Sequence, residues 1–278
     1  MRIITDAVLR DFHEMLQMEE KSDGTIEKYL RDVRSFRTFA GERNITADLV
    51  KTYKKEIMAK YSYSTVNAKL ASLNRLFRYL QWYDCIVKRI RIQSSPFRNP
   101  ERELHRSEYE RLVSTAEHRG DVQLSLLLQT LASTGIRISE LPAITVEVIT
   151  NRRAVITLKG KTREILLPKK LCSKLKRYAQ KRGITTGSVF ITRSGKHLDR
   201  SNIAHKMKTL CEDAQVDPRK VFPHNFRHLF ACLFYQSTKD MPRLADILGH
   251  SNINTTRIYT AVSGNEQLKQ IEKLKLVI

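Results

Sequence analysis

Apolar residues recur at helical spacing through residues 5–93 of the chain. Between Ser22 and Gly41 the stripe consists of residues three or four apart, which are Ile26, Tyr29, Val33, Phe36 and Phe39. This period predicts an amphipathic helix with one face in a protein core. Ser22 or Asp23 is a suitable N-cap for this helix, and Gly41 is a suitable C-terminal stop.

Similar stripes predict three more helices in the same region. One spans residues 6–21 and one follows Thr46. Another follows Ser64, with its inward positions at Val66, Leu70, Leu73, Phe77 and Leu80. The aromatic residues in these stripes are interpreted as core residues, and residues 1–93 are predicted to form an all-helical domain.

A loss of periodicity separates this region from the rest of the chain. Residues 94–102 contain two prolines and no repeat of apolar positions, which is typical of a linker. Beyond the linker, Ser107 and Glu110 form a capping-box pattern that predicts a helix start. An apolar helix that begins at Val122 is expected to end at Gly135.

A short β-hairpin is predicted in the middle of the second region. Residues 154–158 and 165–167 are β-rich runs, and the turn sequence KGKTR separates them. Helical patterns resume over residues 169–182 and 201–214. The second region is therefore predicted to mix helices with one small sheet.

Two prolines mark the last predicted helices. Pro223 opens one helix, and Pro242 opens another that ends at Gly249. The predicted fold class is mainly α with a small β-sheet. Its parts are an all-helical N-terminal domain over 1–93, a linker over 94–102 and a mixed α+β domain over 103–278 that ends in a tail helix.

The chain is strongly basic, with 50 Lys and Arg against 29 Asp and Glu and a formal net charge of +21. A field of this size attracts polyanions. The charge is spread through segments predicted to fold, which favours a nucleic-acid-binding surface over a membrane-anchoring peptide. The same patterning identifies candidate DNA contacts after residue 60.

Between Lys60 and Arg91 the sequence holds seven Lys or Arg and one acidic residue, Asp84. Arg75 and Arg78 lie off the apolar stripe, so both are expected to point outward. Contact with DNA phosphates is the predicted use, and a solvated face is the simpler alternative. The candidate DNA-binding residues are Lys69, Arg75, Arg78, Lys88, Arg89 and Arg91.

Membrane and secretory classes do not fit this sequence. No apolar run approaches the roughly 18 residues of a membrane span, and the N-terminus lacks the apolar core of a signal peptide. The four cysteines have no CxxC spacing, which argues against disulfides and a zinc site. A cytoplasmic location with no membrane partner is therefore expected.

Four fragments of the second region carry side chains suited to phosphodiester chemistry. In chain order they are TGIRISEL with Arg137, PHNFRH with His224 and Arg227, LGH with His250, and TTRIY with Tyr259. Arginine presents a fork of donors that fits phosphate oxygens. The spacing of His224 and Arg227 puts both on one helical face. Tyrosine is the candidate nucleophile, and His224 is the candidate acceptor of its proton.

Simpler interpretations exist for each of these residues. Arg137 can form an ion pair with Glu140, a histidine after Leu-Gly is a common exposed helix cap, and Tyr259 can be a core tyrosine. His224 and His228 are four residues apart, but the glutamate of the HExxH zinc motif is absent. The sequence also has no acidic cluster suited to two metal ions. Neither a metal nor another cofactor is therefore expected.

These residues, in this order, resemble the catalytic set of the tyrosine recombinase, or phage integrase, family. The resemblance covers roughly residues 102–262, and residues 22–41 resemble the family's N-terminal core-binding domain. It implies a site-specific DNA recombinase that integrates, excises or resolves DNA elements through a 3′-phosphotyrosyl intermediate. It also implies that His250 hydrogen-bonds the scissile phosphate.

A lysine in the hairpin turn protonates the leaving 5′ oxygen in this family. Lys161 is the preferred candidate, because its distance from Arg137 and the following TREILLP fit the family pattern, and Lys159 is the alternative. The resemblance further implies double-stranded DNA as partner, with a monomer in solution and a homotetramer on synapsed DNA. The apolar stripe of the last residues, NEQLKQIEKLKLVI, packs either on its own domain or in a pocket of a neighbouring subunit.

Other functions remain compatible with the sequence. A type IB topoisomerase or a hairpin-forming resolvase would use the same chemistry, and a non-catalytic DNA-binding accessory protein could share the scaffold. Because the chain begins close to the core-binding domain, an arm-site-binding domain is not expected, which favours an Xer-like architecture. The sequence specifies neither the DNA target nor the choice between a mobile-element integrase and a chromosome-dimer resolvase.

Overall fold

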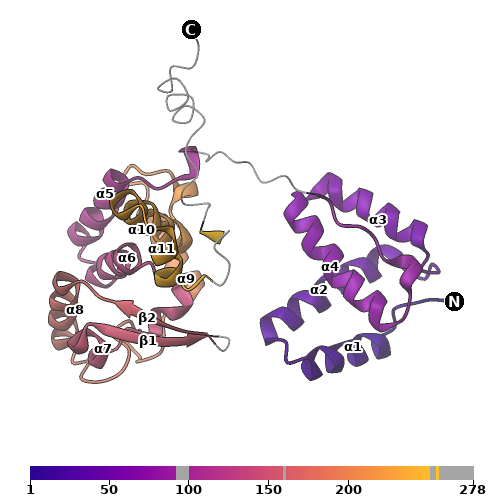
Figure 1. The fold of residues 1–278 in the computed structure, drawn as a ribbon, viewed down its shortest axis with the longest axis horizontal. Coiled ribbons are helices and arrows are strands. Elements are labelled where there is room, and N and C mark those ends of the chain that lie inside the picture. The colour runs from indigo at the N-terminus through magenta and orange to yellow at the C-terminus, as the bar shows by residue number, and fades with distance from the viewer. Residues whose placement is uncertain (92–99, 159–160, 251–254, 257–278) are drawn as a thin grey trace, which may run out of the picture. The chain divides into compact units, whose positions relative to one another are not determined.

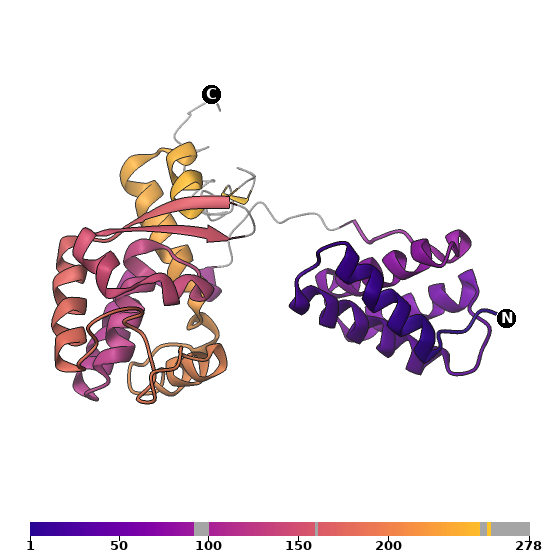
Figure 2. The ribbon, with the colours of Figure 1, turned by 90° about the horizontal axis from the view of Figure 1, so that it is seen from below.

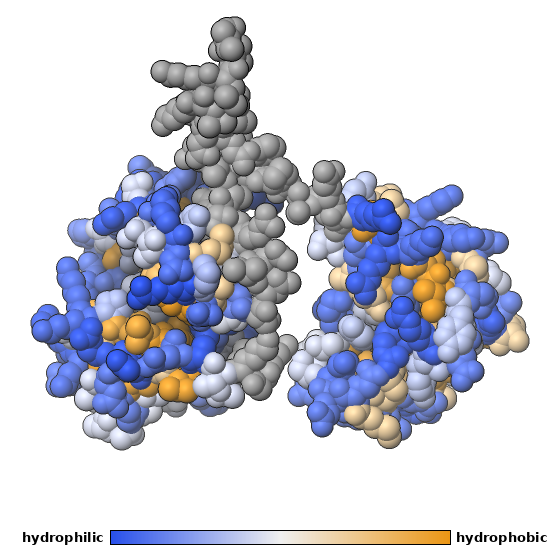
Figure 3. Space-filling view, viewed as in Figure 1, coloured by the Kyte–Doolittle hydropathy of each residue, from blue (hydrophilic) through white to orange (hydrophobic). Residues whose placement is uncertain are grey.

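The computed structural model of the protein describes residues 1–91, 100–158, 161–250 and 255–256 (Figure 1). The chain divides into two compact units, Met1–Ser94 and Ser95–Ile278. The fold is mostly helical with a small two-stranded sheet, which confirms the predicted fold class. The face seen in Figure 3 is mostly hydrophilic on both units.

Four helices form the N-terminal unit, in agreement with the apolar stripes. They are α1 (Asp6–Met18), α2 (Asp23–Ala40), α3 (Ala47–Lys60) and α4 (Tyr63–Tyr79). Thr46 and Ser62 cap α3 and α4 through their side chains, because each accepts a bond from a backbone N–H in the first turn. The fourth helix therefore begins before Ser64, and the first ends at Met18 instead of residue 21.

The core of this unit is aromatic as well as aliphatic. Phe12, Phe36 and Phe77 are fully buried, and the rings of Phe36 and Phe77 meet edge to face at 5.9 Å between centroids. The interpretation of these stripes as core is confirmed. The charged side chains of α4 consequently lie on the sides of the helix that face α1, α2 or solvent.

Most of the described residues of the second unit are helical, and its two strands form one hairpin. Its elements are α5 (Arg106–His118), α6 (Val122–Thr134), α7 (Val146–Asn151), β1 (Arg153–Leu158), β2 (Lys161–Leu166), α8 (Lys169–Lys181), α9 (Arg200–Thr209), α10 (Pro223–Thr238) and α11 (Met241–Leu248). Short 3-10 segments cover Pro100–Arg102, Ile138–Ala143 and Pro218–Lys220. The strands pair antiparallel, and β2 contacts α11 (Figure 2).

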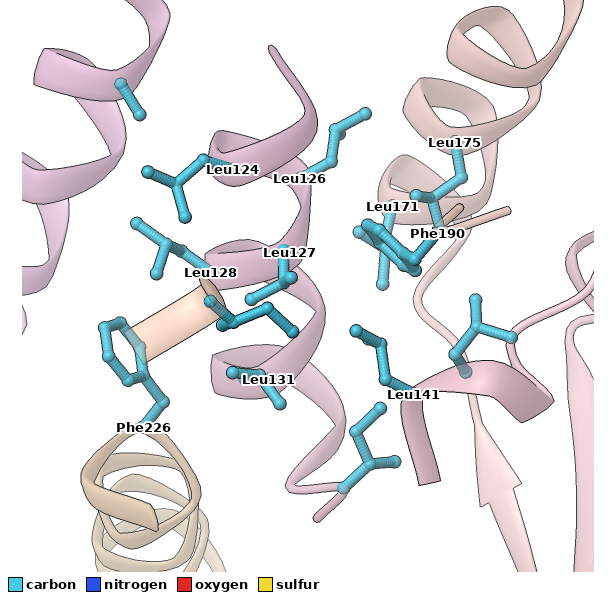
Figure 4. Packing of buried hydrophobic residues seen from close by; sticks show 14 of the residues in the cluster. Leu124, Leu126, Leu127, Leu128, Leu131, Leu141, Leu171, Leu175, Phe190 and Phe226 are labelled. Atoms are coloured by element: carbon cyan, nitrogen blue, oxygen red, sulfur yellow. The ribbon is translucent and has the colours of Figure 1, made fainter. Parts of the chain in front are cut away.

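Helix α6 lies at the centre of this unit. Leu124, Leu127 and Leu131 are buried between the neighbouring helices, with Phe226 of α10 on one side and Leu171 of α8 on the other (Figure 4). Eight of the 13 residues of α6 are buried, so this helix contributes to the core on more than one side. Gly135 ends α6 with φ +65°, and a Cβ at this position would lie 2.5 Å from the ring of Phe230.

Two predicted helix boundaries in this unit are wrong. The cap of α5 comes from Glu108, whose carboxylate accepts the backbone N–H of His105 at 2.8 Å, so the predicted pair of Ser107 and Glu110 is shifted. Helix α9 ends at Thr209 and not at residue 214, because the N–H of Cys211 bonds to the carbonyl of Lys208 in a tighter turn.

The hairpin turn is shorter than its sequence suggested. Leu158 pairs with Lys161, so only residues 159–160 separate the strands and Lys161 opens β2. Most of the predicted KGKTR turn is therefore strand. The short helix α7 was not predicted, since its six residues are too few to show a helical period.

Candidate active site

Helix α10 carries two of the predicted catalytic residues in its first two turns. Pro223 occupies the first helical position, and His224 and Arg227 follow one turn apart. The side chain of Arg227 is buried, with 1% of its surface exposed. It donates to the carbonyl oxygens of Gly135 and Leu248, each at 2.6 Å. These carbonyls lie at the C-terminal ends of α6 and α11, where the helix dipoles favour a cation.

Arg227 also contacts His250. The guanidinium lies 3.1 Å from Nε2 of His250, and because a guanidinium only donates, Nε2 is the acceptor in this pair. The proton of the neutral ring then resides on Nδ1, which donates to Oγ1 of the buried Thr256 at 2.9 Å. Burial, followed by the charges of Arg227 and Arg137, lowers the pKa of His250 to about 4. The ring is therefore neutral at neutral pH.

Arg137 precedes the 3-10 segment Ile138–Ala143 and is anchored by Glu140. Its guanidinium donates to Oε1 of Glu140 at 3.0 Å, and its backbone N–H donates to Oε2 at 2.7 Å. The Glu140 side chain is 1% exposed, whereas that of Arg137 is 37% exposed. The ion pair considered as a simpler interpretation therefore exists, and it leaves Arg137 accessible from solvent.

Glu140 is buried but charged. Burial alone would raise its pKa, but the backbone N–H of Arg137 and the charge of Arg163 outweigh that effect, so the pKa is lowered. Arg163 comes from β2 and donates both to Glu140 and to the carbonyl of Ile247 at the end of α11. One carboxylate thus holds two arginines from different elements.

An open cleft of about 1190 Å³ runs beside these groups. Its lining includes Arg137, Glu140, Arg163 and His250, together with Phe230 of α10. Arginines and carboxylates are equal in number over the whole lining, and Arg137 presents to this cleft a guanidinium whose side chain is 37% exposed. An anion such as a phosphodiester is therefore the suitable occupant near Arg137.

His224 is exposed, and its pKa is lowered. Partial desolvation is the largest cause, followed by the charges of Arg227, His228 and Arg137. A neutral imidazole at neutral pH has a free acceptor nitrogen and can take a proton from a phenol.

The structure brings together four of the predicted catalytic residues, which are Arg137, His224, Arg227 and His250. Tyr259 and Lys159 lie outside the described residues. Lys161 is placed by its backbone at the start of β2, and its side chain is not described.

The candidate DNA-binding residues of the N-terminal unit fall into two groups. Lys69 and Arg75 are half-buried and form ion pairs with Asp32 and Glu19, respectively. Arg75 keeps 30% of its side chain exposed, but Glu19, just beyond the end of α1, engages its guanidinium. The exposed group consists of Arg78, Lys88, Arg89 and Arg91.

Sequence reasoning missed three contributors to the site, which are Arg163, Thr256 and the anchoring role of Glu140. A buried charge inside a hairpin gives no periodic signal, so only the fold reveals it. Within the described ranges no cluster of His, Cys, Asp and Glu has a geometry suited to a metal. All four cysteines are buried, and Sγ of Cys232 lies 3.6 Å from Nε2 of His228. No helix among these residues is long and apolar enough to cross a bilayer.

A buried arginine, an accessible arginine and two neutral histidines beside an open cleft define a phosphodiester-processing class of enzyme. The sequence profile of the phage integrase family matches residues 102–266, and that of the phage integrase N-terminal SAM-like domain matches residues 9–83. The chain belongs to the phage integrase family. It is a tyrosine recombinase, an enzyme that cuts and rejoins DNA at specific sites.

Proteins similar to this chain are named tyrosine recombinases. Tyrosine recombinase XerA of Pyrococcus horikoshii is 26% identical over 99% of this chain and 96% of its own length. Tyrosine recombinase XerD of Vibrio cholerae is 26% identical over 90% of this chain and 89% of its own length.

Solved structures of related proteins share the fold. XerH recombinase bound to its difH substrate before cleavage has a TM-score of 0.71 at 21% identity, over 91% of this chain and 79% of that chain. A lambda integrase tetramer bound to a Holliday junction has a TM-score of 0.73 at 14% identity, over 91% and 76% of the two chains.

Proposed function

We propose that Arg137, His224, Arg227 and His250 bind the scissile phosphate and that Tyr259 attacks it. The observation that carries this proposal is the position of Arg227, which ties the ends of α6 and α11 together next to His250. Three of the four motifs, which carry Arg137, His224 with Arg227, and His250, thereby lie together on one side of one unit. Surface ion pairs do not require such convergence.

The chemistry balances without an external energy source. The phenolic oxygen of Tyr259 bonds to phosphorus while His224 accepts the phenolic proton, and the bond from phosphorus to the 5′ oxygen breaks. The 5′ oxygen takes a proton from a lysine. The 3′-phosphotyrosyl bond is similar in energy to the bond broken, so a 5′ hydroxyl from another strand can reverse the step.

Protonation states of the two histidines suit different roles. Neutral His224 can act as the proton acceptor. His250 is kept neutral by burial and by nearby arginines, and a bound phosphate would offset those positive charges. Its pKa should therefore rise when DNA binds, and a proton on Nε2 would let His250 donate to the phosphate in place of its contact with Arg227.

Tyr259→Phe tests the nucleophile. The variant should bind a target duplex almost normally and form no covalent adduct, because packing is kept while the attacking oxygen is lost. Denaturing gels of a nicked duplex measure the adduct. Adducts that persist in this variant would place the nucleophile elsewhere, and band shifts without adducts in the unaltered protein would favour the accessory-protein alternative.

We propose Lys161 as the acid for the leaving 5′ oxygen, with Lys159 as the alternative. In the register of the hairpin Lys161 lies two residues before Arg163, which contacts the site. Lys161→Ala should slow cleavage of ordinary DNA far more than cleavage of a 5′-bridging phosphorothiolate, since sulfur leaves without a proton. If only Lys159→Ala shows this rescue, the assignment passes to Lys159.

The substrate is proposed to be double-stranded DNA, bound by a monomer and recombined in a homotetramer. The tetrameric assembly of lambda integrase on a Holliday junction and the family membership support this assembly. Arg78, Lys88, Arg89 and Arg91 are the proposed phosphate contacts of the N-terminal unit, because they are exposed. A cytoplasmic, nucleoid-associated location follows from this substrate. Relaxation of supercoiled DNA without synapsis would favour the topoisomerase alternative.

A further inference from the structure

Arg163 lies at an inward position of the hairpin. It pairs with Ile156 in the register, and its side chain is 9% exposed, while Thr162 and Glu164 on either side are exposed. Arginine is almost never buried unless it is paired. An inward position of a strand normally carries an apolar residue, as Ile165 does two positions later. The charge at position 163 therefore requires a reason.

Its two terminal nitrogens reach two different elements. One donates to Oε2 of Glu140, the carboxylate that also anchors Arg137. The other donates to the carbonyl of Ile247 in the last turn of α11. A planar guanidinium can bridge acceptors on separate elements in a fixed geometry, which a lysine ammonium cannot reproduce.

The carbon stem of Arg163 also fixes the end of α11. Gly249 has φ +65°, and a Cβ built there would lie 2.5 Å from Cδ of Arg163. The residue that follows, His250, donates its backbone N–H to the carbonyl of Ala245 at 3.0 Å. Arg163 therefore packs against the backbone immediately before His250.

We propose that Arg163 is a positioning residue for the phosphate site. It acts on Arg137 through Glu140 and on His250 through the end of α11, and it does not itself bind the phosphate. This inference rests on the proposed roles of Arg137 and His250.

The balance of charge explains how the effect reaches the phosphate. Glu140 accepts from the guanidinium groups of both Arg137 and Arg163. When Arg163 is removed, the negative charge of Glu140 acts on Arg137 alone and holds the Arg137 guanidinium more tightly. Less positive charge is then available to neutralise the nonbridging oxygens in the transition state.

The test compares Arg163→Met and Arg163→Lys with Arg153→Met. Arg153 lies on the same hairpin, is exposed and pairs with Glu164, so its replacement controls for loss of a hairpin charge. The measurement is the rate of covalent adduct formation at saturating protein on three nicked duplexes. These contain an ordinary scissile phosphate, a neutral methylphosphonate or a 5′-bridging phosphorothiolate.

Arg163→Met should slow adduct formation on the ordinary phosphate by about 10- to 100-fold, the cost of a small misplacement of catalytic groups. The methylphosphonate should recover most of this loss, because it has no nonbridging charge to neutralise. The phosphorothiolate should recover none of it, because the leaving group is not the affected part. Arg163→Lys should keep part of the defect, and Arg153→Met should react normally.

Partial unfolding lowers the rates on all three duplexes by the same factor, so the ratio of rates reports positioning even if Arg163→Met is less stable. A normal ratio in Arg163→Met, or rescue by the phosphorothiolate alone, overturns the inference. Arg137→Ala serves as reference: if it shows no methylphosphonate rescue, the proposed function fails. If it shows rescue and Arg163→Met does not, only the role of Arg163 fails.

Discussion

At the residue scale, Arg227 and Arg137 differ in burial and in the groups that accept their hydrogen bonds. Arg227 is buried and has carbonyl acceptors at the ends of two helices, so it maintains the packing of the unit as well as presenting charge. Arg137 is accessible and is held by one carboxylate. Arg227 thus links the ends of two helices inside the unit, whereas Arg137 presents its guanidinium to solvent.

A half-buried histidine on α10 gives the unit a predictable pH dependence. His228 faces Glu103, with Nε2 and Oε1 3.4 Å apart, and Cys232, at 3.6 Å. His224 is also close enough to be affected by its charge. Burial lowers the pKa of His228, but its bonds to Cys232 and Glu103 outweigh that effect and raise it to about 9.

Because this pKa is raised above the usual 6.5, the stabilisation is complete below pH 6.5 and is lost as pH rises through about 9. We expect the free energy of unfolding of the second unit to fall by about 1 to 3 kcal/mol over that window. His228→Gln should flatten this part of the curve, and Glu103→Gln should do the same. Urea titrations at several pH values measure it, and an unchanged slope in both variants would contradict the assignment.

At the element scale, the site is built from the ends of helices. Helix α6 ends at Gly135, α11 ends at Gly249, and α10 begins at Pro223, and all three ends meet around Arg227. The hairpin contributes through β2, which contacts α11. Backbone carbonyls that helices leave unpaired at their C-termini thereby become acceptors for an arginine.

Gly135→Ala tests the importance of one of these ends. The variant suffers both a positive φ and a Cβ 2.5 Å from the ring of Phe230. We expect a loss of roughly 2 to 4 kcal/mol in the free energy of unfolding, the sum of backbone strain and overpacking. Adduct formation should fall as well, because the carbonyl of Gly135 accepts from Arg227.

Gly183→Ala is the matched control for this variant. Gly183 has φ +66° and nothing within 4 Å of a built Cβ, so only the backbone strain of about 1 kcal/mol remains. Equal losses in the two variants would show that the contact with Phe230 is relieved and that the end of α6 is not sterically fixed.

At the scale of the whole molecule, the helical unit and the mixed unit carry different sets of functional side chains. The mixed unit contains the described side chains that are proposed to bind the scissile phosphate, and the helical unit carries exposed cations in and after α4. The net charge of +21 suits a polyanionic substrate for both. Contacts by both units with one duplex would account for cations on each.

Truncation after Gly264 tests whether the final residues act between subunits. We expect a folded protein that binds one half-site but loses cooperative binding to two half-sites and strand exchange, because the apolar stripe after this residue would dock on a neighbour. Gel shifts on half-site and full-site DNA measure this. Full cooperativity after truncation would exclude the intersubunit role, and an unfolded product would favour packing of the tail on its own domain.

The sequence by itself determined the helical elements and the motifs of the site. Period and capping were sufficient for α2 and α3, because those signals are local, and the order of Arg137, His224, Arg227, His250 and Tyr259 was sufficient for the family. The start of α5 and the length of the hairpin turn were predicted wrongly from local signals. The carboxylate of Glu108 sets the start of α5, and the strand register sets the length of the turn.

Only the tertiary structure decided which cationic side chains form ion pairs within the protein and which stay exposed and accessible to DNA. Arg75 and Arg78 are close in sequence, yet Glu19 of a different segment engages the first and not the second. Arg163 and Glu140 are 23 residues apart, and their pairing exists because the hairpin contacts, through β1, the 3-10 segment that carries Glu140. Contacts between distant segments leave no periodic trace in a sequence, since each partner's spacing is set by the fold and not by its own neighbours.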